Sequence, residues 1–156
     1  VVQSHKREML AKTSINSVHV RFVPIDFTTD DLFTKLTEAG FDASKRTLFL
    51  WEGVTLYLSV SEIDQTMQML KDKATPGSVL LADIYADRMI AFLNKSGGKV
   101  LELTDESLSF GLSFDTNWQQ VLKDFVEPKS MQVDEAHFLG SNDEKGPYAV
   151  VAEILC

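Results

Sequence analysis

The sequence has one cysteine, no excess of basic residues and no long apolar run, and each shortage excludes a class of protein. Cys156 alone cannot form a disulfide within the chain, which fits a reducing, cytoplasmic compartment. The formal charge of −8 over 156 residues leaves no basic face for phosphates, so we expect no nucleic-acid partner. No apolar segment reaches the length of a membrane span, so we expect no membrane partner either.

The chain also lacks the short motifs that mark common enzyme sites. It contains neither the phosphate loop GxxxxGKS/T nor the patterns GxGxxG and GxSxG. The three histidines, His5, His19 and His137, lie far apart without ligand spacing, so the sequence predicts no metal site. Apolar residues make up 44% of the chain, enough for the core of a single domain.

The pattern along the chain is an alternation of strands and helices. Strands are predicted at Val18–Val23, Leu48–Trp51 and Ser78–Ile84, and a closing antiparallel hairpin at Met131–Leu139 and Tyr148–Leu155. The dense run Leu48–Trp51 is typical of a strand buried on both faces. Helices are predicted at Val1–Lys12, Asp30–Ala39, Ser59–Thr75, Ala86–Leu93 and Asp115–Phe125, with Gly97–Gly98 as a flexible loop. This order predicts an α/β fold with a mostly parallel sheet, helices on both of its faces and the hairpin at one edge.

Three acids follow the predicted parallel strands: Asp26, Glu52 and Asp83. The carboxyl ends of parallel strands face one crevice, where open α/β sheets bind ligands. Carboxylates there can accept hydrogen bonds from ribose hydroxyls, an adenine amino group or an ammonium group. The alternative is that the acids cap the following helices, and for Asp83 both interpretations stay open.

The residues also carry a resemblance to a known family. Phe22–Phe27, Ala39–Asp42, Leu48–Leu58 and Pro76–Ser78 resemble successive blocks of the leucine carboxyl methyltransferase-like group of class I S-adenosylmethionine-dependent methyltransferases. The members most similar are proposed O-methyltransferases of polyketide and other secondary metabolism, and Trp-Glu-Gly-Val-Thr-x-Tyr-Leu is the most specific block. The resemblance implies a Rossmann-like sheet, S-adenosylmethionine as cofactor, and methyl transfer to a carboxylate or hydroxyl of a small molecule or a protein C-terminus.

The resemblance also implies roles for particular residues. Asp26 and Phe27 would hold the adenine end of the cofactor, and Glu52 would reach it from the next strand end. Tyr57 and Tyr85 match positions near the pocket. No residue is assigned to catalysis. A phenol or alcohol acceptor would need a base, for which His137 and Tyr85 are the candidates.

One departure from the family is large. The first two strands of its sheet, the glycine-rich turn that cradles the methionine part and the ribose-binding acid have no counterpart in this sequence. We therefore expect an incomplete methyltransferase domain over 1–156, a fragment inactive by itself, with further residues before Val1. The strand at Val18–Val23 would then lack neighbours. The alternative function is a non-catalytic α/β binding module, a degenerate methyltransferase; the sequence does not predict the oligomeric state.

Overall fold

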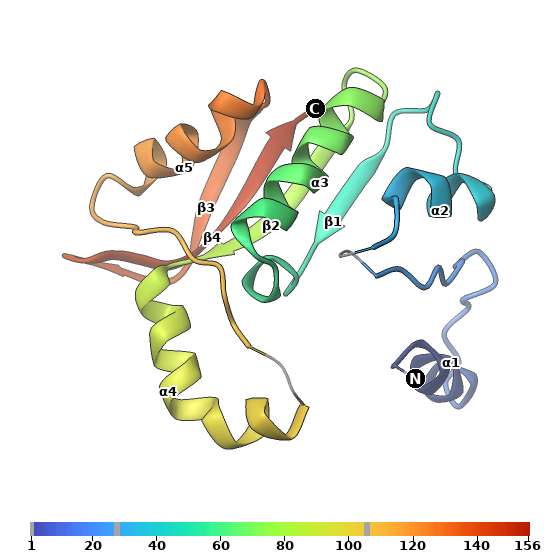
Figure 1. Cartoon of the computed structure of the whole chain (residues 1–156), viewed down its shortest axis with the longest axis horizontal. Coiled ribbons are helices and arrows are strands. Elements are labelled where there is room, and N and C mark those ends of the chain that lie inside the picture. The colour runs from blue at the N-terminus through green and yellow to red at the C-terminus, as the bar shows by residue number, and fades with distance from the viewer. Residues whose placement is uncertain (1, 27–28, 105–106) are drawn as a thin grey trace. The chain divides into compact units, whose positions relative to one another are not determined.

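The computed structural model describes residues 2–26, 29–104 and 107–156, with the backbone alone at Val2, 97–104 and 141–143. These residues form two compact units, Val1–Asp42 and Ala43–Cys156, called here the first and the second unit. Figure 1 labels the helices and strands of both. The expectation of a single incomplete domain stays a prediction.

The first unit contains two helices, α1 (Val2–Ala11) and α2 (Leu32–Glu38), at the predicted places. Asp31 caps α2, because its side chain accepts a hydrogen bond from the Thr34 amide at 2.7 Å. Gly40 follows the helix with a φ of 91°, the left-handed conformation that commonly ends helices.

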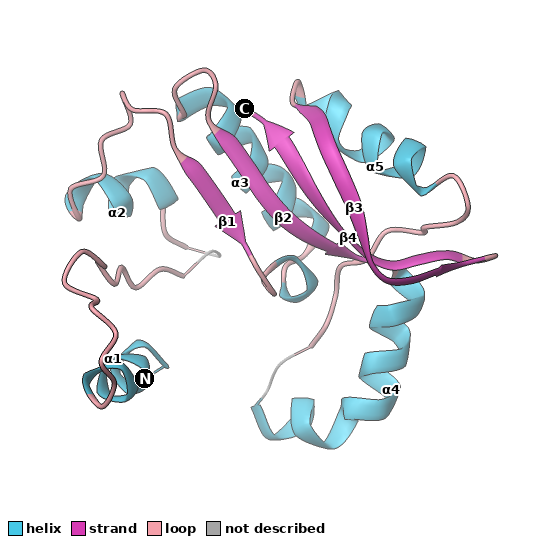
Figure 2. Cartoon of the chain, turned by 180° about the vertical axis from the view of Figure 1, so that it is seen from behind, coloured by secondary structure: helices cyan, strands magenta, loops and turns pink. Residues whose placement is uncertain are grey.

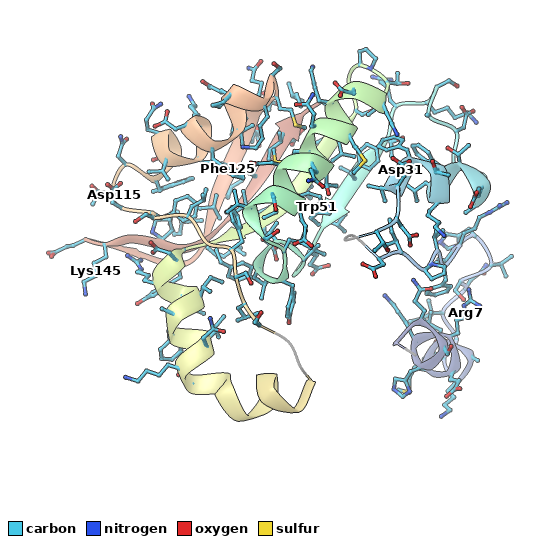
Figure 3. The ribbon with its side chains drawn as sticks, in the orientation of Figure 1. Arg7, Asp31, Trp51, Asp115, Phe125 and Lys145 are labelled. Carbon is cyan, nitrogen blue, oxygen red and sulfur yellow. The ribbon has the colours of Figure 1, made fainter. Side chains whose placement is uncertain are left out.

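The strand predicted at Val18–Val23 is wrong, because this segment is irregular in the structure. Side chains rather than a neighbouring strand meet its backbone: the Gln3 amide donates to the Val23 carbonyl at 2.8 Å. The Arg7 guanidinium lies 5.0 Å from the centre of the Phe22 ring (Figure 3 labels Arg7). Val18 is 94% exposed. Alternating apolar residues form a strand only where a partner strand completes the ladder, and the described residues supply none here.

The second unit is built on a mixed sheet of four strands, β1 (Leu48–Trp51), β2 (Val79–Tyr85), β3 (Gln132–Asp143) and β4 (Gly146–Leu155). Their order is β1-β2-β4-β3 (Figure 2). β1 and β2 are parallel, whereas β4 is antiparallel to both β2 and β3. The α/β class and the closing hairpin are confirmed. The described sheet has a single parallel pair because Val18–Val23 does not join it.

Helices α3 (Val60–Lys73) and α5 (Trp118–Val126) lie on the same face of this sheet, in front in Figure 1 and behind in Figure 2. Alternate residues of the two central strands are buried on that side: Leu80, Ala82, Ile84, Val150, Ala152 and Ile154. Helices α3 and α5 therefore share one face of the sheet, whereas the element order predicted helices on both faces. Short 3-10 turns η1 (Thr55–Tyr57) and η2 (Glu127–Lys129) complete the unit.

Two further predictions in this unit need correction. Helix α4 (Asp87–Thr104) continues through Gly97–Gly98, where a loop was predicted. Each glycine costs a helix only about 1 kcal/mol relative to alanine, which the rest of a long helix can override. Leu48 and Leu50 are 65% and 58% exposed, so β1 is not buried on both faces. As the outer strand of the sheet it packs mainly through Trp51.

The start of α3 has the capping box that its sequence predicts. Ser59 and Glu62 form a capping box, in which the Ser59 hydroxyl accepts from the Glu62 amide and the Glu62 carboxylate accepts from the Ser59 amide. Ile63, Met67 and Leu70 are buried on the inner face of the helix. No helix in the described part of the chain is long and apolar enough to cross a membrane.

Candidate functional site

The carboxyl ends of the parallel strands β1 and β2 place two acids side by side. Trp51 pairs with Ala82 in the ladder, so the residues that follow them, Glu52 and Asp83, are neighbours at the same edge. A cavity of about 400 Å³, called here the acid cavity, is lined by Leu50, Trp51, Glu52, Leu81, Ala82, Asp83, Leu139 and Val151. This is the position at which α/β sheets bind ligands.

Asp83 is the centre of a hydrogen-bond network that fixes this edge. Its Oδ2 accepts from the Gly53 amide at 2.8 Å and from the Tyr85 hydroxyl at 3.2 Å. Its backbone carbonyl accepts from the hydroxyl of Thr55 at 2.7 Å. Three hydrogen-bond donors therefore converge on Asp83. One comes from the turn after β1, one from η1 and one from β2. The network holds the Glu52–Gly53 turn, where Gly53 has a φ of 64°, against the end of β2.

The other carboxylate oxygen of Asp83 has no such partner. Asp83 is 8% exposed, and its Oδ1 is buried without a hydrogen bond to any described residue. An unsatisfied buried acceptor costs about 1–3 kcal/mol, more when it is charged. Such an atom calls for a partner beyond the described residues, such as an ordered water or a bound ligand. The site therefore offers one unused acceptor beside the carboxylate of Glu52.

Tyr85 connects the acids to the apolar part of the unit. Its carbonyl accepts from the Leu112 amide at 2.9 Å, and its ring packs against the buried cluster of Leu56, Ile90 and Leu108. Burial raises the pKa of the Tyr85 phenol above its usual value, and the carboxylate of Asp83 raises it further. The phenol therefore keeps its proton at neutral pH and donates it to Asp83.

A second cavity of about 510 Å³, called here the tyrosine cavity, has Tyr85 in its wall. Its lining is almost wholly apolar: Tyr85, Met89, Phe92, Leu139, Gly140, Tyr148 and Ala149. Leu139 borders both cavities. The two cavities therefore share Leu139, and the hydroxyl of Tyr85 in the apolar cavity donates to Asp83 of the cavity that holds the two acids.

The residues predicted for the site are distributed over both units. Asp26 is exposed in the first unit, where its amide donates to the Asp30 carboxylate at 2.9 Å. Phe27 lies outside the described residues. Glu52 is exposed at the acid cavity. The cofactor-binding set Asp26, Phe27 and Glu52 stays a prediction.

The two candidate bases differ in position. His137 lies on β3 with its side chain 79% exposed and 3.6 Å from the Glu135 carboxylate, and it lines neither cavity. Tyr85 lines the tyrosine cavity, but its raised pKa keeps the phenol protonated at neutral pH, so it is not available as a base. Tyr57, 46% exposed, ends η1.

The role of Asp83 could not be decided from the sequence. An acid inside the otherwise apolar run Val-Leu-Leu-Ala-Asp-Ile-Tyr was a signal that the position is special. Its partner Gly53, however, lies 30 residues away, so only the strand pairing shows what the carboxylate holds. Among the described residues, no group of three His, Cys, Asp or Glu side chains could hold a metal ion.

Comparison with known proteins gives a consistent result. Residues 1–71 match the model of the family described as leucine carboxyl methyltransferase, which confirms the resemblance. A protein of Mycobacterium tuberculosis, named as a proposed S-adenosyl-L-methionine-dependent methyltransferase, is 28% identical over 116 residues, covering 73% of this chain and 36% of the relative. One of Mycolicibacterium vanbaalenii with the same name is 39% identical over 72 residues, 46% of this chain and 23% of the relative. The chain thus spans about a third of the length of such relatives.

The fold has a counterpart among solved structures. The crystal structure of a proposed methyltransferase from Thermobifida fusca superposes with a TM-score of 0.60 at 17% sequence identity. The match covers 97% of this chain and 57% of that one. The sheet and helices described above therefore form the same fold as part of that protein.

Proposed function

Because residues 1–71 match the leucine carboxyl methyltransferase family, we propose that this chain carries part of the site of an S-adenosylmethionine-dependent O-methyltransferase. The observation that supports the proposal most is the unused Oδ1 of Asp83 beside Glu52, at the ligand edge of the parallel strands. The methyl acceptor is a carboxylate or hydroxyl of a small molecule or of a peptide, in a cytoplasmic setting.

The residues of the acid cavity suit this cofactor chemically. S-adenosylmethionine presents an ammonium group, an adenine amino group and ribose hydroxyls, all hydrogen-bond donors. Glu52 and Asp83 offer acceptors only, and one of them is buried and unpaired. Glu52 and Asp83 would hold donors of the cofactor here, while Asp26 and Phe27 would hold its adenine end.

When bound, the cofactor supplies an electrophilic methyl group on a sulfonium. The contribution of this chain is positioning, which can lower a barrier by about 7–11 kcal/mol in well-oriented reactions. The tyrosine cavity would hold the body of the acceptor next to the acid cavity. A carboxylate acceptor is already ionised at neutral pH and needs no base, whereas a hydroxyl must lose its proton.

We expect the isolated chain to bind S-adenosylmethionine weakly, because its sequence holds no glycine-rich turn for the methionine part. The expected dissociation constant is about 1 mM or higher, equivalent to roughly 4 kcal/mol of binding free energy. Isothermal titration calorimetry at micromolar protein should therefore show no saturable heat. Tight stoichiometric binding would contradict the idea that the site is only partly present.

Changing Glu52→Gln should weaken even this binding, because the amide keeps the shape of the side chain but loses its charge. Loss of a charged hydrogen bond is worth about 1.5–3 kcal/mol, so affinity should fall roughly tenfold or more. The measurement is an NMR titration with millimolar cofactor, followed at the Gly53 amide. Glu135→Gln is the matched control, since Glu135 has 70% of its side chain exposed on β3. Equal affinities for the two variants would remove Glu52 from the site.

A non-catalytic binding module, a degenerate methyltransferase, is the second candidate. The same titration separates the two. A shift at the Gly53 amide that Glu52→Gln abolishes favours the enzyme, whereas no shift even at cofactor concentrations far above a dissociation constant of about 1 mM favours the module.

A further inference from the structure

We propose that the tyrosine cavity takes a neutral, apolar compound that presents a hydroxyl group, and that it discriminates against carboxylates. The inference deepens the proposed function, on which it rests, by naming the class of the methyl acceptor. It is carried by the lining of the cavity, by the direction of the hydrogen bond made by Tyr85, and by the charges beside it.

The lining defines the body of the ligand. Among its described residues there is no Lys, Arg or His that could neutralise an anion. Met89 and Phe92 of α4 contribute apolar side chains, and Phe92 is 60% exposed although large and apolar. A cavity of about 510 Å³ lies within the range of about 300–1,000 Å³ that is usual for small-molecule sites. These features suit an aromatic ring system or a similar apolar body.

The polar group of the ligand is defined by Tyr85. A phenol has a single proton, and Tyr85 donates it to Asp83 Oδ2. The Tyr85 oxygen can then act toward a ligand only as an acceptor. A hydroxyl group can donate to it, but an ionised carboxylate has no proton to donate. The hydrogen bond between Tyr85 and Asp83 therefore selects a donor.

The charges at the site act in the same direction. Burial contributes most to the raised pKa of Tyr85, and the negative charges of Asp83 and Glu52 add to it. Groups that disfavour a negative charge on the Tyr85 oxygen also disfavour an anionic ligand next to it. The guanidinium of Arg88 lies 4.7 Å from the centre of the Tyr148 ring and donates to the carbonyls of Lys145 and Gly146 at the hairpin.

The test compares three probes of one shape: a naphthol, the matching naphthoate and naphthalene. Binding is followed by NMR at the Met89 methyl group of the whole chain, without cofactor, so failure of the proposed methyl transfer would not affect the result. We expect the naphthol to bind about three to ten times more tightly than naphthalene, the range for one net hydrogen bond. The naphthoate should bind more weakly than both.

Two variants identify the groups responsible. Tyr85→Phe should remove the preference for the naphthol over naphthalene. Asp83→Asn keeps an oxygen that can accept from Gly53 and Tyr85 but removes a negative charge, so it should reduce the discrimination against the naphthoate. Asp72→Asn makes the same charge change on the exposed side of α3 and should alter neither preference.

Three outcomes would overturn the inference. The first is a naphthoate that binds as tightly as the naphthol, which would favour a carboxylate acceptor while leaving methyl transfer itself possible. The second is equal binding of naphthol and naphthalene to the unmodified chain, which would show that the hydroxyl is not recognised. The third is no shift at Met89 with any probe, which would show that the cavity takes no such compound. The probe comparison in the unmodified chain needs no variant to fold.

Discussion

Gly146→Ala is expected to destabilise the second unit by about 2–5 kcal/mol, from a strained backbone and a steric overlap together. Gly146 begins β4 with a φ of 82°, a conformation that costs an L-residue roughly 1–2 kcal/mol. A Cβ at this position would lie 2.8 Å from the Cα of Asp115 and closer still to its carbonyl. Real Cβ atoms essentially never approach backbone this closely, so the segment before α5 would have to move.

The hairpin offers a matched control in Gly140→Ala. Gly140 has a nearly identical φ of 78°, yet a Cβ there would meet no atom within 4 Å. Gly140→Ala should therefore lose only the stability that the left-handed backbone conformation costs an L-residue, about 1–2 kcal/mol. Urea unfolding of both variants measures the difference, which isolates the contact between the hairpin and Asp115 (Asp115 and Lys145 are labelled in Figure 3). Equal losses for the two variants would contradict that contact.

Asp83→Ala is the second change with a large expected effect, a loss of about 2–4 kcal/mol. It removes the acceptor for the Gly53 amide and for the Tyr85 hydroxyl, and both donors lie in a partly buried setting. Leaving two such donors unpaired costs about 1–3 kcal/mol each, less whatever water can restore. The midpoint of thermal unfolding gives the measurement.

Asp83→Asn separates the contribution of the hydrogen bonds to Gly53 and Tyr85 from the contribution of the negative charge of Asp83. The asparagine oxygen can accept from the same two donors, and its amide nitrogen replaces the unpaired Oδ1. Its stability should therefore stay within about 1 kcal/mol of the unmodified chain. If Asp83→Asn lost as much stability as Asp83→Ala, the carboxylate charge rather than the hydrogen bonds to Gly53 and Tyr85 would hold the strand end together.

Local signals predicted the local features of the fold. The capping box of Ser59 and Glu62 and the glycine after α2 specify helix ends within a few residues, and both are confirmed. Val18–Val23 has the alternation of a strand but no partner among the described residues, so its pattern could not form a ladder. The exposure of Leu48 and Leu50 likewise depends on what lies beside β1, which the run of apolar residues cannot specify.

In the candidate site, too, the sequence predicted local features but not the contacts between distant residues. The sequence indicated acids at strand ends, and the structure places Glu52 and Asp83 at one edge. The sequence could not indicate that Asp83 holds the Glu52–Gly53 turn, or that Oδ1 of Asp83 stays unpaired. Both features depend on contacts between residues about thirty positions apart. The hydrogen bond from Tyr85 to Asp83, which selects the ligand in our proposal, is local, since the two residues lie two positions apart on β2.

The position of β1 has a consequence for how this sheet can grow. β1 pairs with β2 on one side, and on its other side no described strand completes the ladder. Backbone groups at such an edge are a template for another extended segment. A strand added in parallel would end beside Glu52, because the carboxyl ends of parallel strands align. Edge pairing at β1 would therefore enlarge the acid cavity as well as the sheet.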